Sequence, residues 1–285
     1  MPDFPIIDTH LHLWDPKHLR YPWLEADPLL NRPYLLADYA KACGSVAVDK
    51  MVFVQCECAP VQYKVEVDWI SELSDDDPRI SGIVSWAPLE KGSDVSAELA
   101  KLKANPLVKG VRRIIQFEPD PAFCLQRDFV RGVQALADFD LSFDICVKGD
   151  QMFKNTIELV AQCPAVNFIL DHIGKPFIKE KTFEPWASYL QKMAAFPNTW
   201  CKMSGLATEA DFQTWTKEED LKPYIDHVLK SFGTSRVIFG GDWPVAIQAT
   251  SYTRWVETLE WALAGASEAD LRRIFYENAL TFYRL

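Results

Sequence analysis

The chain of 285 residues carries a formal net charge of −10 at pH 7. Proteins that bind nucleic acid or an anionic membrane surface cluster Lys and Arg, so this acidic balance argues against both as partners. No apolar run approaches the ~20 residues that a membrane span needs, and the 48% of hydrophobic residues predicts a large core.

The cysteines and the N-terminus predict a reduced, cytoplasmic protein. The chain has seven cysteines, an odd number, and several of them lie inside apolar runs. A secreted, disulfide-rich chain is expected to carry an even set at regular spacing. No basic region followed by an apolar stretch opens the sequence, so no signal peptide is expected.

Eight short apolar runs are predicted to be strands. They cover residues 4–8, 50–56, 79–86, 109–115, 141–147, 166–172, 198–205 and 236–243. Most are apolar almost throughout, which is typical of strands buried on both faces of a parallel sheet. Helical spacing fills the stretches between them, at residues 35–43, 65–77, 93–106, 128–139, 155–164, 185–197, 223–233 and 251–265, and a last helix is predicted over 267–285.

Eight units of strand and helix in a chain of this length predict an α/β fold, the (β/α)8 or TIM barrel, as a single domain over residues 1–285. The alternative is an open, doubly wound sheet. No glycine-rich fingerprint follows the first strand to support that alternative.

A long loop after the first strand does not fit the simple count of units. Residues 13–34 are rich in Trp, Tyr and Pro and include Trp14 and Trp23. Long ordered loops in compact domains are usually functional. This loop is expected on the C-terminal face of the barrel, where barrel enzymes have their active sites.

Polar side chains fall at the C-terminal ends of most predicted strands. In chain order they are His10, His12, Gln55, Glu57, Arg112, Arg113, Asp144, Lys148, Asp171, His172, Lys202, Ser204 and Asp242. A buried charge is costly unless it is paired or used. Packing alone therefore does not explain the pattern, and an active site is predicted at this end of the barrel.

His10 and His12 are the first candidates. Residues two apart in a strand point to the same face, so both imidazoles are predicted to project into one spot. Asp242 follows two glycines, which let the backbone approach a ligand closely. The alternative for Asp242 is a carboxylate that caps the following turn.

Three further charged residues are interpreted from their strands. Lys202 lies in an apolar strand and needs a partner or a function. Arg112 and Arg113 are adjacent, so one should point into the barrel and the other toward the helices. We interpret Arg112 as the inward one, with a salt bridge as the alternative for either.

The motifs "DTHLHLWDP", "DHIGKP", "KMSGL" and "FGGDWPV", after the first, sixth, seventh and eighth strands, resemble those of the amidohydrolase superfamily. The resemblance is to its amidohydrolase-2 branch, which contains sugar lactonases and dicarboxylate lactone hydrolases. It covers the whole chain, with the motifs in the expected order. It implies a (β/α)8 barrel that hydrolyses an ester-like bond.

The resemblance also implies site residues. His10 and His12 match the paired histidines, His172 matches the histidine of the sixth strand, and Asp242 matches the aspartate that activates water. The fifth strand has no histidine and the fourth has no bridging lysine, which argues against a two-metal centre. No cofactor is expected to be obligatory, and a single Zn²⁺ held by His10, His12 and Asp242, with or without His172, stays open.

Hydrolysis of a sugar lactone is the function that these features favour. Asp242 is predicted to be the general base, and His172, His10 and His12 are predicted to stabilise the oxyanion. Substrate binding is predicted for Glu57, Arg112, Lys202, Trp14 and Trp23.

Three alternatives and one question stay open at this point. Because Arg binds carboxylates well, a carboxylated lactone is an alternative substrate. A metal-dependent decarboxylase and a non-catalytic sugar-binding protein on the same barrel are the other two. The sequence does not decide whether the chain forms a homo-oligomer.

Overall fold

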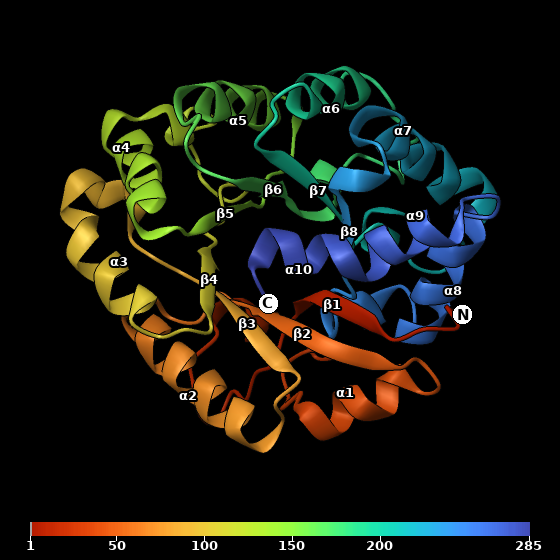
Figure 1. Cartoon of the computed structure of the whole chain (residues 1–285), viewed down its shortest axis with the longest axis horizontal. Helices are drawn as coiled ribbons and strands as arrows, with labels where there is room; N and C mark the ends of the chain where they lie inside the picture. Colours follow the sequence, from red (N-terminus) through yellow and green to blue (C-terminus); the bar gives the residue numbers. More distant parts are fainter. Residues whose placement is uncertain (1) are drawn as a thin grey trace.

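The computed structural model describes residues 2–285 and confirms the (β/α)8 barrel as a single domain. Eight parallel strands follow one another around the barrel in chain order (Figure 1). They are β1 (Ile6–Leu11), β2 (Val48–Val54), β3 (Ile80–Ser85), β4 (Val108–Val111), β5 (Ser142–Ile145), β6 (Phe168–Leu170), β7 (Thr199–Met203) and β8 (Val237–Phe239).

The barrel closes between β1 and the segment that follows β8. Leu11 pairs with Trp243 in parallel. The backbone N–H of His12 donates to Trp243 O at 2.8 Å, and the N–H of Asp242 donates to His10 O at 2.8 Å. This closure excludes the open, doubly wound sheet.

Each strand is followed by a helix of the outer ring (Figure 1). These helices are α1 (Leu36–Cys43), α2 (Tyr63–Asp76), α3 (Ser96–Lys103), α4 (Arg127–Ala135), α5 (Asp150–Gln162), α6 (Trp186–Ala194), α7 (Lys222–Phe232) and α8 (Tyr252–Ala262). Among residues 2–285, no helix has the length and apolar character needed to cross a bilayer.

Several strands end earlier than the apolar runs predicted. β4 ends at Val111 and β8 at Phe239, although the runs continued to residues 115 and 243. The remaining residues leave the sheet, because the chain turns there toward the mouth of the barrel. At Asp242 the backbone has a φ of 55°, which no strand residue adopts.

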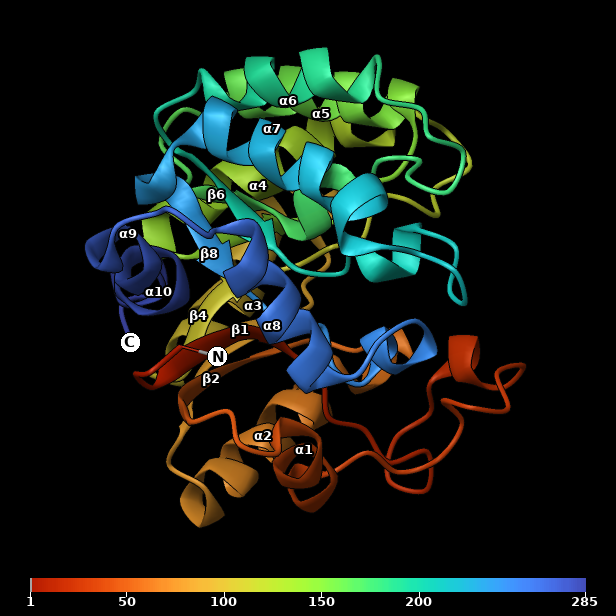
Figure 2. The ribbon, with the colours of Figure 1, turned by 90° about the vertical axis from the view of Figure 1, so that its right-hand side faces the viewer.

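The single helix predicted for residues 267–285 is divided. α9 (Glu268–Arg272) and α10 (Asn278–Tyr283) are separated by a π-helical segment, Arg273–Glu277. α10 lies across one end of the barrel, and the loops after β1 and β7 lie at the opposite end (Figure 2). Side chains of α10 pack against the barrel interior in a cluster that includes Ile7, Val52, Val84, Ile169, Ile238, Ala279, Phe282 and Tyr283. α10 therefore plugs the N-terminal end and leaves the C-terminal end for a site.

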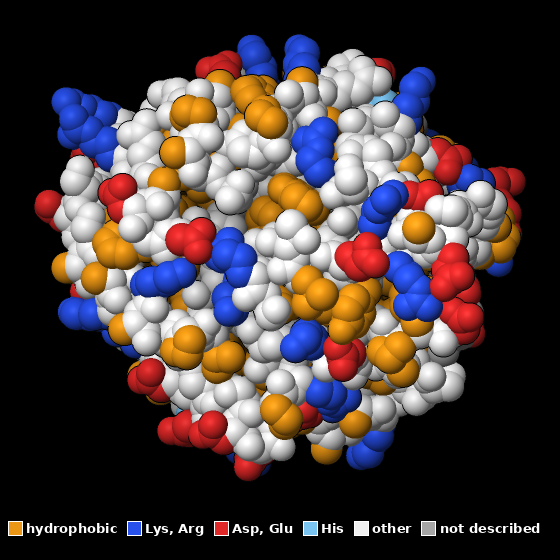
Figure 3. Space-filling model, in the orientation of Figure 1, with side chains coloured by type: hydrophobic (Ala, Val, Ile, Leu, Met, Phe, Trp, Pro, Cys, Tyr) orange, Lys and Arg blue, Asp and Glu red, His pale blue; other side chains and the backbone are white. Residues whose placement is uncertain are grey.

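The face that carries α10 mixes charges of both signs. Lys and Arg side chains alternate there with Asp and Glu, and hydrophobic side chains are scattered among them (Figure 3). A nucleic-acid surface gathers its basic residues into a patch or stripe. The side chains drawn on this face form no such stripe.

Candidate active site

A cavity of about 390 Å³ lies at the C-terminal ends of the strands. This volume is within the range of small-molecule sites. Residues that follow all eight strands contribute to it. The lining consists of His12, Pro22, Trp23, Cys56, Glu57, Cys58, Pro60, Trp86, Arg112, Ile114, Gln116, Phe117, Cys146, His172, Lys175, Thr208, Asp242 and Val245.

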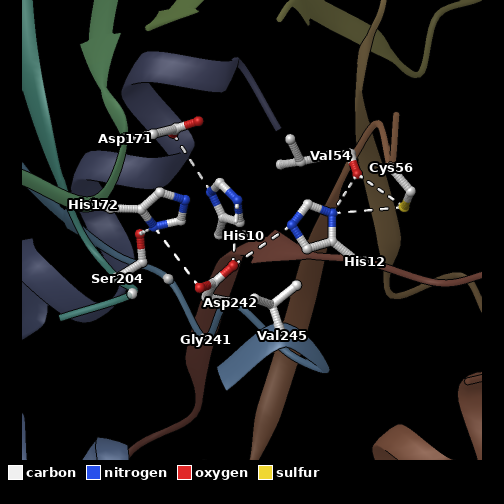
Figure 4. A network of polar contacts seen from close by, with 12 residues as sticks. His10, His12, Val54, Cys56, Asp171, His172, Ser204, Gly241, Asp242 and Val245 are labelled. Carbon is white, nitrogen blue, oxygen red and sulfur yellow. Dashed lines mark hydrogen bonds and ion pairs between the residues drawn. The ribbon is translucent and has the colours of Figure 1, made fainter. Parts of the chain in front are cut away.

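Three imidazoles surround the carboxylate of Asp242 (Figure 4). His10 Nε2 lies 3.8 Å and His12 Nε2 lies 3.6 Å from Asp242 Oδ1, and His172 Nδ1 lies 4.0 Å from Oδ2. The rings of His10 and His12 meet edge to face at 4.9 Å. The structure thus brings together the four residues that the sequence analysis singled out as catalytic.

Asp8, which sequence reasoning passed over, holds the two sides of this cluster in register. Its Oδ1 accepts the backbone N–H groups of His10 at 3.0 Å and Gly241 at 2.8 Å. A Cβ at position 241 would lie 2.5 Å from Asp8 Oδ2, so glycine is required for this approach. Tyr39 donates its hydroxyl to the same Oδ2 at 2.8 Å.

His12 is fixed in one tautomer. Its Nδ1 lies 2.7 Å from Val54 O, and because a carbonyl can only accept, Nδ1 carries the proton. The lone pair of Nε2 then points toward Asp242 (Figure 4). Burial lowers the pKa of His12, although Asp242 acts in the opposite direction, so the ring is neutral at pH 7.

His10 is fixed in the same way from the other side. Arg112 Nη1 lies 3.2 Å from His10 Nε2 and can only donate, so Nε2 accepts. The protonated Nδ1 then faces Asp171 Oδ1 at 3.5 Å. Burial, followed by the charge of Lys202, lowers the pKa of His10 well below its ordinary value.

His172 lies at the end of β6 in a left-handed conformation, with a φ of 52°. Its Nδ1 lies 3.0 Å from the hydroxyl of Ser204. A Cβ at position 205 would lie 2.4 Å from that Nδ1, so Gly205 makes room for the ring. Burial, and then His10, lower the pKa of His172 well below its ordinary value.

Lys202 lies outside the cavity lining, although substrate binding was predicted for it. Its side chain is 0% exposed, and Nζ lies 2.8 Å from Asp144 Oδ2 and 2.9 Å from Asp171 Oδ1. Burial would lower the pKa of Lys202, but Asp144 and Asp171 raise it, so the ammonium stays charged. Lys202 therefore lies deeper in the barrel than the cavity, where its ammonium group is paired with two carboxylates and is not available to a substrate.

Arg112 points inward and lines the cavity, but its guanidinium is largely engaged. Nη2 donates to Gln55 O at 2.6 Å, and Nη1 lies 3.4 Å from Asp171 Oδ2. Arg113 points the other way and pairs with Glu118 at 2.6 Å. Glu57 also lines the cavity, and one of its oxygens accepts from the amide of Gln55 at 2.7 Å.

The two tryptophans predicted to bind substrate have different places. Trp23 lines the cavity, and its Nε1 donates to Cys56 O at 2.8 Å. Trp14 is buried behind it and does not line the cavity; its ring meets that of Trp23 edge to face at 5.4 Å. Trp14 Nε1 donates to Leu30 O at 3.1 Å, which anchors the loop of residues 13–34.

Sequence reasoning also missed several residues of the lining. Lys175 belongs to "DHIGKP", and Trp86 and Gln116 follow the third and fourth strands. The position of Lys175 inside a quoted motif was a usable signal. Trp86 ends the predicted strand 79–86 and Gln116 follows the predicted strand 109–115, so their position at a strand end was a signal for both.

The donor atoms of His10, His12 and Asp242 fit a single divalent cation. Nε2 of each histidine and a carboxylate oxygen lie within 4.8 Å of one another. All three are acceptors, and three protein ligands with a water make an ordinary catalytic zinc shell. Arg112 competes for one of them, because it donates to His10 Nε2.

A second donor set, formed by His10, Asp171 and His172, fits a cation less well. Its carboxylate is already paired with Lys202 and Arg112. A cation there would have to displace charges that the protein itself supplies.

A cluster of histidines and an aspartate at the C-terminal end of a (β/α)8 barrel is typical of a hydrolase active site, and the family comparison agrees. Residues 7–285 match the amidohydrolase family profile Amidohydro_2. The chain belongs to this amidohydrolase family.

Sugar lactonases are among the relatives of this chain. The chain is 31% identical to an L-fucono-1,5-lactonase of Burkholderia multivorans, over 98% of this chain and 96% of that protein. It is 25% identical to an L-rhamnono-gamma-lactonase of Scheffersomyces stipitis, over 100% of both. A crystal structure of an amidohydrolase from Burkholderia multivorans with bound zinc matches with a TM-score of 0.88 and 30% identity, over 99% of this chain and 100% of that chain.

Proposed function

We propose that this amidohydrolase hydrolyses the lactone of a neutral sugar acid, with Asp242 as the general base. One observation carries the proposal: a carboxylate that lines the cavity with neutral imidazoles around it and no Lys or Arg within 4.0 Å among the described residues. Such a carboxylate is free to take a proton from water. The sugar lactonases among the relatives support the choice of substrate.

In the proposed mechanism, Asp242 both accepts and returns the transferred proton. The carboxylate takes a proton from water as the water oxygen bonds to the acyl carbon. The ring C–O bond then breaks, and the protonated Asp242 returns its proton to the leaving alkoxide. The product is an open-chain hydroxy acid, which ionises and releases a proton to the solvent.

His12 and His172 have different parts in this mechanism. Because Nε2 of His12 is an acceptor, it orients the water and does not stabilise an oxyanion, a role different from that predicted from the sequence. His172 can serve the oxyanion: when Ser204 donates to its Nδ1, the proton is on Nε2. When no cation is bound, His10 is a positioning residue, since its Nε2 accepts from Arg112 and its Nδ1 faces Asp171 Oδ1 at 3.5 Å.

A divalent cation such as Zn²⁺ would be held by His10, His12 and Asp242. When bound, it would supply Lewis-acid polarisation and lower the pKa of a coordinated water. The bound zinc in the related crystal structure supports this assignment.

The cavity favours a neutral lactone over a carboxylated one. Arg112, the arginine considered above as a clamp for a carboxylate, already contacts His10, Asp171 and the backbone of Gln55. Glu57 in the same lining disfavours a second negative charge. Gln116, Trp23 and Trp86 suit the hydroxyls and apolar ring faces of a sugar.

A panel of aldonolactones and carboxylated lactones, followed with a pH indicator, tests the proposal. We expect acid release from one or more neutral aldonolactones and slower release from carboxylated ones. CO₂ release from an aromatic acid would favour the decarboxylase. Sugar binding without acid release from any lactone would favour a binding protein.

A further inference from the structure

Lys175 differs from the other cations around the cavity in having no partner. Arg112 pairs with Asp171, and Lys202 bridges two carboxylates. Lys175 lines the cavity, and its side chain is half-buried. Among residues 2–285, no carboxylate oxygen lies within 4.0 Å of its Nζ. An ammonium group in a cavity is a strong donor, and here that donor capacity is left for a ligand.

The backbone places Lys175 beside His172 at a conformational cost. His172, Ile173, Gly174 and Lys175 all have positive φ, of 52°, 52°, 79° and 48°. Non-glycine residues rarely adopt this region and are held in it by their surroundings, most often at functional sites. Trp186 holds the turn by donating its Nε1 to Ile173 O at 2.8 Å. Both side chains that the turn presents, His172 and Lys175, line the cavity.

The electrostatic surroundings keep Lys175 charged. Burial alone would lower its pKa, but Cys146, Glu209 and Asp242 raise the pKa above its ordinary value. A fixed positive charge in a partly enclosed cavity stabilises an oxygen that gains negative charge during a reaction. In lactone hydrolysis that oxygen is the acyl oxygen.

We propose that Lys175 is a further catalytic residue, whose ammonium donates to the acyl oxygen, stabilises the oxyanion together with His172, and then binds the carboxylate of the product. This inference rests on the proposed lactonase function. It also narrows the substrate class: the unpaired cation serves the acyl group, so the other ring substituents face Glu57 and Gln116 and are neutral hydroxyls.

Substitution of Lys175 with a matched control tests this role. Lys175→Met is expected to lower kcat on the best aldonolactone roughly 100-fold, the cost of losing one oxyanion donor, with a smaller change in KM. Lys175→Arg, which keeps the charge, is expected to recover part of kcat. Lys179→Met removes a charge four residues away, from an exposed pair with Asp211, and is expected to leave kcat unchanged.

A binding measurement gives a second readout that needs no turnover. The aldonate product is titrated into each variant and followed by tryptophan fluorescence, since Trp23 and Trp86 line the cavity. Lys175→Met and Lys175→Gln are expected to weaken aldonate binding at least tenfold, and Lys179→Met is not.

The outcomes separate this inference from the proposed function. If the unmodified protein cleaves a lactone and Lys175→Met keeps more than half of kcat, the role of Lys175 is overturned and the lactonase stands. Unchanged aldonate binding in folded Lys175→Met and Lys175→Gln would overturn it as well. If the unmodified protein cleaves no lactone of the panel, both proposals fall.

Discussion

The barrel holds buried charge in opposite ways on its closed side and at its open end. On the closed side, beneath the cavity and next to α10, Lys202 pairs with Asp144 and Asp171, and Tyr283 donates its hydroxyl to Asp144 at 2.6 Å. At the open end, Asp242 faces three neutral rings and no cation within 4.0 Å in the described chain. Satisfied networks stabilise a fold, whereas groups without partners are available to a ligand. The paired charges therefore lie beneath the site and the carboxylate without a cation lies in it, and Asp171 links the two through its contacts with Arg112 and His10.

Asp242→Asn removes the proposed general base at the open end and is expected to have the largest effect on activity. The amide keeps the shape of the side chain but cannot take a proton from water, so kcat on a cleaved lactone is expected to fall about 10³-fold. The melting temperature is expected to stay close to that of the unmodified protein. Asp211→Asn, in an exposed loop, serves as the control, and near-normal turnover of Asp242→Asn would refute the general-base assignment.

Lys202→Met removes the buried ammonium group on the closed side. It leaves the carboxylates of Asp144 and Asp171 buried without their ammonium, which is expected to cost about 3–5 kcal/mol in the free energy of unfolding. Urea denaturation measures this loss. Lys101→Met removes an exposed partner of Glu98 and is expected to cost less than about 1 kcal/mol; equal losses in the two variants would contradict the contrast between the ends.

Glu66 extends the comparison to the pH dependence of stability. It is a buried carboxyl near the open end, and it accepts a hydrogen bond from the Cys56 N–H at 3.2 Å. Burial raises its pKa from 4.5 to about 8. Between these values the folded protein holds a proton that the unfolded chain has lost. The contribution of Glu66 to stability is therefore fully present below pH 4.5 and is lost as the pH rises toward 8, by about 1.4 kcal/mol per pH unit.

Glu66→Gln is expected to remove this part of the pH dependence. The free energy of unfolding, measured by urea denaturation at pH 5 and pH 8, is expected to differ less in this variant than in the unmodified protein. Glu72→Gln, at an exposed position of the same helix, is the matched control. The same pH dependence in all three proteins would show that Glu66 titrates normally.

Tyr283→Phe gives the smallest effect. It removes a hydrogen bond to a buried carboxylate, which is expected to cost about 1.5–3 kcal/mol in stability. It is expected to leave kcat unchanged because Tyr283 does not line the cavity. Thermal unfolding and lactone turnover measure the two quantities. Tyr276→Phe loses a bond to the exposed Asp49 and is expected to cost less; a large drop in kcat for Tyr283→Phe would mean that the two ends are coupled.

The sequence predicted the barrel and the cluster around Asp242, because both follow from local patterns. Strand parity put His10 and His12 on one face, and the order of strands brought His172 and Asp242 to the same end. The alternation of side chains along a strand does not tell how deep in the barrel a side chain lies. Lys202 points into the barrel, but it lies below the cavity and not in its lining. That depth depends on where each strand ends, and neighbouring strands determine it.

Lys175 and α10 could not be predicted for a different reason. The direction of Lys175 results from consecutive left-handed residues, which the tertiary structure imposes against local preference. The division of the last helix goes with its packing against the barrel interior, where Phe282 and Tyr283 are buried among the strands. Trp14 and Trp23 show the same dependence, since only one of two similar side chains in the loop reaches the cavity.

The contact between Asp8 and Gly241 has a consequence for protein synthesis. These residues are 233 positions apart in the chain, so the hydrogen bond that aligns His10 with Asp242 forms only after nearly all of the barrel has left the ribosome. Long-range contacts of this kind slow folding, and domains fold as units during translation. The nascent chain therefore carries His10 and His12 apart from Asp242 until the last strand emerges, and the cluster around Asp242 forms as one of the final events of its synthesis.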